Sequence, residues 1–202
     1  FTYTPALATV SKANLTVTAN NDAKFVGESD LSAYSGVRYF GFVASESASV
    51  LSGGIAISRS NAAVNAAGTY SGVLSAASST LSSTNYNITY APGNYTIIPA
   101  DQLLIRLADT STTYGTAPSY TLSSVQYKSS TGGAVVDLTS RAAVNTSAFT
   151  LSDGAGGNTA LTLAPLSSTL SSAGQVAVGS YQVGASSITN TSANYSNTVN
   201  IV

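Results

Sequence analysis

Apolar and polar residues alternate along much of the chain, which predicts β-strands nearly throughout. Two stretches have the two-residue period of a strand with one buried face. Residues i and i+2 of a strand share a face, so we expect the apolar members of both stretches to point into a core. These members are Leu15, Val17 and Ala19 in the first stretch, and Leu103, Ile105 and Leu107 in the second.

Short β-like runs and turn signals fill most of the remaining sequence, and we expect very little helix. Pro92 and Gly93 lie between two aromatic-bearing runs, a pattern that predicts a hairpin at 91–94. Residues 30–42 are read as a loop followed by a strand, because Gly36 and Gly41 weaken a helix there. The other predicted strands are 55–57, 69–74, 86–90, 95–98, 120–125, 134–138, 160–163, 175–178, 181–183 and 198–202.

The sequence contains an internal repeat. Residues 14–27 align without a gap on 102–115, and the triplet at 68–70 (GTY) recurs at 179–181 (GSY). A period of about 90–110 residues is typical of separate domains and exceeds the unit of a solenoid. We therefore predict an all-β chain of two tandem β-sandwich (Ig-like) domains, 13–99 and 100–202. Pro99 and the absence of glycine from 98–101 predict a stiff, end-to-end joint.

Residues 1–13 resemble a third, partial copy, because they match 88–100. The pairs are Tyr3 with Tyr90, Pro5 with Pro92, and Val10 with Ile97. Residues 1–12 are thus either the final strand of a preceding repeat or a donor strand that pairs with another molecule. An unpaired sheet edge is a template for such a strand. The donor residues would be Phe1, Tyr3, Leu7 and Val10.

Composition excludes much chemistry. The chain has no Cys, His, Met or Trp, so the usual zinc, haem, copper and iron–sulfur ligand sets and the Ser–His and Cys–His nucleophiles are absent. Charged residues are 7 % of the chain, against about 25 % in ordinary domains. The few basic residues are scattered, which argues against nucleic-acid binding. We predict no catalytic residue, no metal and no cofactor, and an uncharged, hydroxyl-rich extracellular surface.

The order of motifs resembles a known family. VSKANLTVTANN at 10–21, FVG at 25–27, GTY at 68–70 and NYNITY…YTIIPA at 85–100 are similar to the MBG and YDG repeats of large bacterial surface adhesins. Many of these adhesins resemble filamentous haemagglutinin, a substrate of two-partner secretion. The resemblance implies a sandwich-like stalk domain at the cell surface. Its implied partners are neighbouring repeats or subunits of the same protein, and surface or matrix polysaccharide.

Candidate chemistry is sparse. Asp22, Glu28 and Asp30 are the closest carboxylates, and their counterparts in the second repeat are not acidic, which favours a solvated turn over an acid–base pair or a calcium site. The loop 153–158 (DGAGGN) offers only two side-chain oxygens, which favours a glycine-rich turn over calcium. The densest aromatic group, which packing in a β core explains better than a sugar platform, is Tyr34, Tyr39, Phe40 and Phe42.

Two kinds of covalent modification are conceivable. A lysine could join an asparagine in an isopeptide bond if both were buried beside a carboxylate, and the candidates are Lys12, Lys24 and Lys128. Six Asn-X-Ser/Thr sequons, which matter only in a glycosylating organism, begin at Asn14, Asn87, Asn94, Asn145, Asn190 and Asn194.

Three roles follow from the sequence. The first is a non-enzymatic structural and adhesive module of a bacterial surface adhesin. The alternatives are a glycan-binding module and a pilus-like subunit that polymerises by donor-strand complementation through residues 1–10. The longest apolar runs are far shorter than the ~20 residues that a membrane span needs.

Overall fold

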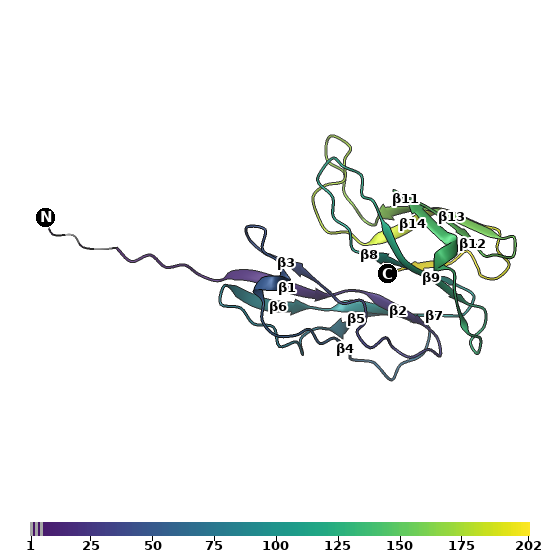
Figure 1. Cartoon of the computed structure of the whole chain (residues 1–202), viewed down its shortest axis with the longest axis horizontal. Coiled ribbons are helices and arrows are strands. Elements are labelled where there is room, and N and C mark those ends of the chain that lie inside the picture. The colour runs from purple at the N-terminus through teal and green to yellow at the C-terminus, as the bar shows by residue number, and fades with distance from the viewer. Residues whose placement is uncertain (1, 3, 5) are drawn as a thin grey trace. The chain divides into compact units, whose positions relative to one another are not determined.

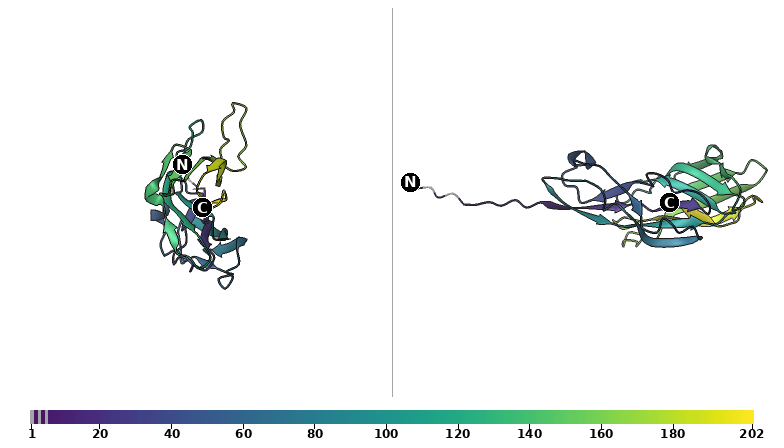
Figure 2. Two further views of the ribbon diagram at one scale, coloured as in Figure 1. Left: turned by 90° about the vertical axis from the view of Figure 1, so that its right-hand side faces the viewer. Right: turned by 90° about the horizontal axis from the view of Figure 1, so that it is seen from below.

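The computed structural model describes residues 2, 4 and 6–202, and these residues form an all-β protein (Figures 1 and 2). They contain no α-helix, only the short 3₁₀ turns η1 (Ala48–Val50) and η2 (Thr139–Arg141). The strands are β1 (Ala13–Ala19), β2 (Asp22–Phe25), β3 (Val37–Phe40), β4 (Ser58–Arg59), β5 (Gly68–Ser75), β6 (Tyr86–Ala91), β7 (Gly93–Ile98), β8 (Leu103–Ala108), β9 (Thr121–Lys128), β10 (Val135–Asp137), β11 (Ala142–Asn145), β12 (Ala148–Ser152), β13 (Asn158–Pro165), β14 (Val183–Asn190) and β15 (Val199–Ile201).

Contacts divide the chain into two compact units. Unit 1 consists of Phe1–Asp22, Ser29–Val64 and Thr69–Thr96. Unit 2 consists of Ala23–Glu28, Asn65–Gly68 and Ile97–Val202. The all-β class and the two sandwich-like domains are confirmed, whereas the domain boundaries derived from the repeat stay a prediction.

In the first sheet, with strand order β3-β1-β6, β1 is the central strand. It pairs antiparallel with β3 and parallel with β6. Leu15 and Val17 are fully buried and Ala19 is nearly so, while the residues between them are partly exposed. The predicted alternation is therefore confirmed, with the apolar face of β1 in the core.

The predicted hairpin at 91–94 is wrong. β6 belongs to the sheet β3-β1-β6, while β7 belongs to the sheet β2-β7-β5-β4, so the chain passes from one sheet to the other at Pro92. Proline has no amide to donate to a ladder, which suits it to this break. A Cβ at Gly93 would lie 2.4 Å from the carbonyl oxygen of Ala19, so only glycine fits beside the end of β1.

Unit 2 contains two four-stranded sheets, β10-β9-β8-β15 and β11-β12-β13-β14. Side chains from both sheets form one core, which makes the pair a sandwich. Leu103 and Ile105 of β8 are fully buried, as predicted. Their partners in the core include Val125, Phe149, Leu151, Leu161 and Leu163.

Some local predictions are wrong. Residues 55–57 form no strand, 175–178 contribute only an isolated bridge from Val176 to Leu170, and β14 begins only at Val183. Conversely, the sequence did not predict β2, β11 or β12. The two-residue connection between β11 and β12 places Thr146 at φ 55, where glycine or asparagine usually signals a hairpin.

Candidate functional site

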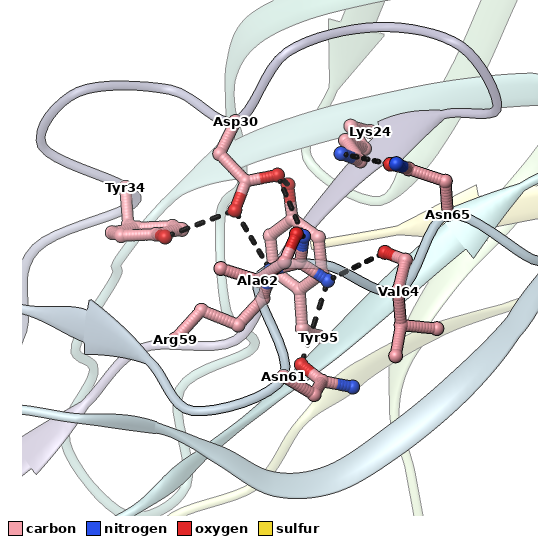
Figure 3. Close-up of polar contacts among 9 residues, drawn as sticks. All are labelled: Lys24, Asp30, Tyr34, Arg59, Asn61, Ala62, Val64, Asn65 and Tyr95. Carbon is pink, nitrogen blue, oxygen red and sulfur yellow. Dashed lines mark hydrogen bonds and ion pairs between the residues drawn. The ribbon is translucent and has the colours of Figure 1, made fainter.

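A densely connected polar group in unit 1 centres on Arg59 (Figure 3). β4 places this arginine in the interior, where its side chain is 0 % exposed. Nε donates to Oδ2 of Asp30 at 2.7 Å, and Nη2 donates to Oδ1 at 3.0 Å. The two parallel bonds form a bidentate, charge-assisted pair, the strongest kind of side-chain hydrogen bonding.

The remaining donors of Arg59 hold the loop that follows β4. Nη2 also donates to the carbonyl of Ala62 at 2.9 Å, and Nη1 donates to the carbonyl of Val64 at 3.2 Å and to Oδ1 of Asn61 at 3.4 Å. The guanidinium group thus joins the segment around Asp30 to the loop 61–64.

Two tyrosines complete the Arg59 cluster, which we define as Arg59, Asp30, Tyr34 and Tyr95. Tyr95 donates to Asp30 at 3.3 Å, and its ring centroid lies 4.5 Å from Cζ of Arg59. Tyr34 donates to Asp30 at 3.0 Å and packs edge-on against Tyr95. Burial, followed by the negative charges of Asp30 and Asp22, raises the pKa of Tyr95. Burial and the bond to Asp30 raise the pKa of Tyr34. Both phenols therefore stay neutral donors near neutral pH, and the cluster acts as a structural clasp.

The three acidic residues of the predicted turn have different environments. Asp30 pairs with Arg59, whereas Glu28 accepts from Nζ of Lys128 at 2.5 Å. Asp22 is buried, and its charge acts on Tyr95. Among the described residues, no three His, Cys, Asp or Glu side chains are grouped so that they could hold a metal ion.

The lysines do not meet the conditions for an isopeptide bond. Lys24, 7 % exposed, donates to Oδ1 of Asn65 at 2.8 Å, but Asn65 is exposed. Lys12 donates to the carbonyl of Ser83, and Lys128 to Glu28 and the carbonyl of Val26.

In unit 2, the loop 153–158 is a turn closed by Asp153. Its Oδ1 accepts from the amides of Ala155 at 2.7 Å and Gly157 at 2.9 Å. Its Oδ2 accepts from Oγ of Ser192 at 2.6 Å and Nδ2 of Asn194 at 3.2 Å. The bond from Ser192, and then that from Ala155, lower the pKa of Asp153. The carboxylate therefore fastens the β12–β13 turn to the segment after β14.

The predicted aromatic group separates into different environments. Tyr39 packs on Phe42, and Phe42 packs edge-on against Tyr86, each with ring centroids 5.5 Å apart. Tyr34 belongs to the Arg59 cluster, and Phe40 is exposed beneath Arg38. The four side chains do not form one platform for a sugar ring.

The sequons fall into two classes. Asn14, Asn87 and Asn145 are exposed, and Asn14 and Asn87 are register partners on β1 and β6. The other three are partly buried and hydrogen-bonded within the fold: Asn94 to the amide of Gly72, Asn190 to Tyr195, and Asn194 to Asp153.

Of the predicted donor residues, Phe1 and Tyr3 lie outside the described residues. Leu7 and Val10 are 94 % and 95 % exposed, and residues 6–12 form no regular element. In Figures 1 and 2 no strand lies beside residues 6–12. The Arg59 cluster, by contrast, was not predicted. Its only sequence signal is an arginine in a segment otherwise poor in charge.

The model of the MBG domain (YGX type) matches residues 15–96, which include most of β1, all of β2 to β6 and most of β7. Residues 15–96 are an MBG domain. No curated protein and no solved structure matches the chain. MBG domains are non-catalytic repeats that occur in surface proteins. None of the described helical segments is long and apolar enough to cross a membrane.

Proposed function

We propose that this chain is a non-enzymatic, load-bearing module of a bacterial surface adhesin. The observation that carries the proposal is the parallel pairing of β1 with β6, because β1 begins the MBG domain and only β7 follows β6 before the domain ends. Their register runs from Ala13 opposite Tyr86 to Thr18 opposite Ala91. The amide of Ala13 also donates to the carbonyl of Asn85 at 3.0 Å.

Parallel pairing determines how a pulling force reaches the ladder. Tension on the chain pulls the start of β1 one way and, once it is transmitted through β7, the end of β6 the opposite way, along the strand axis. All six residue pairs from Ala13 to Thr18 are then sheared together. Two antiparallel strands that are pulled apart at adjacent ends separate one residue pair at a time. Shear therefore requires several backbone hydrogen bonds to break in the same event.

The second repeat has the same arrangement. β15 pairs in parallel with β8, from Val199 opposite Leu103 to Ile201 opposite Ile105. Two further backbone hydrogen bonds extend the ladder. The amide of Leu103 donates to the carbonyl of Thr198 at 3.1 Å, and the amide of Leu107 donates to the carbonyl of Val202 at 2.9 Å. The recurrence of this pairing supports a mechanical role, since tension passes along every domain of a stalk.

Side-chain clasps support the same role. The Arg59 cluster fastens two loops of unit 1, and Asp153 fastens a turn of unit 2. The chain has no cysteine, so no disulfide limits how far it extends under load. We assign the non-catalytic character of the MBG family to the whole chain, and place it at the cell surface among repeats of its own protein.

Stretching single molecules of the full chain between its two ends tests this proposal. The result we expect is two separate, abrupt lengthening events, one for each parallel ladder. Gradual lengthening at low force, without abrupt events, would overturn the load-bearing role. A screen of surface polysaccharides forms the second arm. Specific saturable binding there would favour the glycan-binding alternative.

A further inference from the structure

Within unit 2, a segment from much earlier in the chain covers the outer face of the sheet β10-β9-β8-β15. Residues 23–28 belong to unit 2, although they lie inside the range 15–96 of the MBG domain. Leu103 and Ile105 of β8 point into the sandwich core, so Leu104 between them faces outward. The apolar cluster on this outer face consists of Ala23, Phe25, Ile98 and Leu104, with Val135 and Val202 packed against it.

Two basic residues of unit 2 hold the same segment by its polar groups. Arg106 of β8 donates from its guanidinium group to the carbonyl of Ala23. Lys128 of β9 is only 3 % exposed, and its Nζ donates to the carbonyl of Val26 at 3.2 Å and to Oε1 of Glu28 at 2.5 Å. Hydrogen bonds from charged donors are stronger than those between neutral groups. The outer face therefore binds the backbone of the segment as well as its side chains.

A tight turn at the end of the segment places the acid beside the lysine. The amide of Glu28 donates to the carbonyl of Phe25 at 3.1 Å, which closes the turn. Gly27 has φ 84, a left-handed conformation that glycine adopts without strain. The sequence Phe-Val-Gly-Glu at 25–28 thus combines an apolar anchor, a turn and a negative charge in four residues.

The second repeat lacks the features of this segment. In the repeat alignment, Thr113 stands at the place of Phe25. One position beyond the aligned stretch, Thr116 stands at the place of Glu28. The second repeat therefore offers neither the apolar anchor nor the charge that a buried lysine needs as a partner.

The first repeat, in turn, lacks the face that binds the segment. Thr16 and Thr18 of β1 align with Leu104 and Arg106 of β8. Threonine at these places supplies neither the apolar surface on which a phenylalanine packs nor a cationic donor to a carbonyl. Segment and face are therefore divided between the two repeats, the segment in the first and the face in the second.

We propose that residues 23–28 and the outer face of β8 and β9 are a recognition pair that determines which repeat can follow the MBG domain. The partner that this face fits is a strand that ends in an apolar residue, a glycine turn and an acid. A repeat with threonine at the places of Leu104 and Arg106 does not fit, because it would leave the phenylalanine and the acid without partners. The pair thus fixes the order of the repeats, a role beyond load bearing.

Hydrogen exchange of the full chain tests the proposal first through the segment. Phe25→Thr introduces the residue that the second repeat has at this place. Since Phe25 is 2 % exposed, the amides of β8 and β9 should exchange at least about tenfold faster than in the wild type. Val17→Thr is the matched control, because it introduces the same residue at a fully buried position of β1. It should leave the exchange of β8 and β9 unchanged.

The second arm changes the face. Lys128→Met retains the apolar stem and removes the donor to Val26 and Glu28. The amides of 23–28 should then exchange at least about tenfold faster, and by a larger factor than those of β12 and β13. Arg141→Met, a change of an exposed basic residue in the same unit, should leave the amides of 23–28 at their wild-type rates.

Circular dichroism checks that each variant is folded, and Lys128→Met decides the question if Phe25→Thr fails to fold. Two results would overturn the proposal. One is wild-type exchange of β8 and β9 in folded Phe25→Thr, and the other is an equal effect of Lys128→Met and Arg141→Met on the amides of 23–28. These outcomes do not depend on the load-bearing role, which concerns the ladders β1–β6 and β8–β15.

Discussion

Replacing Arg59 by methionine tests the role of the Arg59 cluster. Methionine retains most of the apolar stem and removes the guanidinium group. The change takes from Asp30 both bonds of its bidentate pair, and it leaves the carbonyls of Ala62 and Val64 without that donor. We expect a marked loss of stability in unit 1.

The magnitude follows from burial. Removing one partner of a buried ion pair costs about 3–5 kcal/mol, because the other charge remains desolvated. The side chain of Arg59 is 0 % exposed but that of Asp30 is 20 % exposed, so water can partly solvate the remaining carboxylate. We therefore expect the lower end of the range, about 3 kcal/mol. For a domain of this size, 1 kcal/mol corresponds to about 4–8 °C, so Tm should fall by about 12–24 °C.

Urea unfolding and thermal melts of the full chain measure the effect. Arg141→Met is the matched control, since Arg141 is exposed and its replacement should stay within about 0.5 kcal/mol. The double variant Arg59→Met/Asp30→Leu should be more stable than Arg59→Met alone, because it leaves no unpaired charge. A loss of less than about 0.5 kcal/mol in Arg59→Met would refute the reasoning.

Three further predictions concern other parts of the fold. Val17→Asp places a charge at a fully buried position and should unfold unit 1, while hydrogen exchange should show that the amides of unit 2 are still protected. The control Asn14→Asp, at an exposed position of the same strand, should change the stability of unit 1 little. Tyr95→Phe retains the ring over Arg59 but loses the bond to Asp30, and should cost about 0.5–1.5 kcal/mol in urea unfolding. The lowered pKa of Asp153 means that its stabilisation is present above the ordinary value of 3.8 and is lost as pH falls below it, so Asp153→Asn should flatten the acid side of the pH–stability profile.

The sequence predicts best where one strand face is buried and the other is not. β1 has this form, and its burial agrees with the alternation, whereas β8 buries Leu103, Leu104 and Ile105 in succession, so both of its faces are covered there. Alternation reveals which side chains share a face but not which strand is the neighbour. The hairpin at Pro92 was therefore predicted wrongly, since β6 and β7 alternate equally well in a hairpin and in two sheets.

The remaining features depend on contacts between residues far apart in the sequence. β2 escaped prediction because it buries Asp22 and Lys24, and Lys24 finds Asn65 only in the folded chain. Asp30 and Arg59 are 29 positions apart, and neither belongs to a recognisable motif. No local pattern marks such a cluster, because its stability comes from burial that folding creates.

The direction dependence of mechanical unfolding tests the central claim most directly. The chain has no cysteine, so pairs of introduced cysteines define where the force acts. Ser11→Cys with Pro92→Cys loads β1 and β6 in shear, whereas Ser11→Cys with Thr84→Cys pulls the same ladder apart from its Ala13–Tyr86 end. The account predicts that the first pair withstands a clearly higher force than the second. Equal forces in the two directions would contradict it.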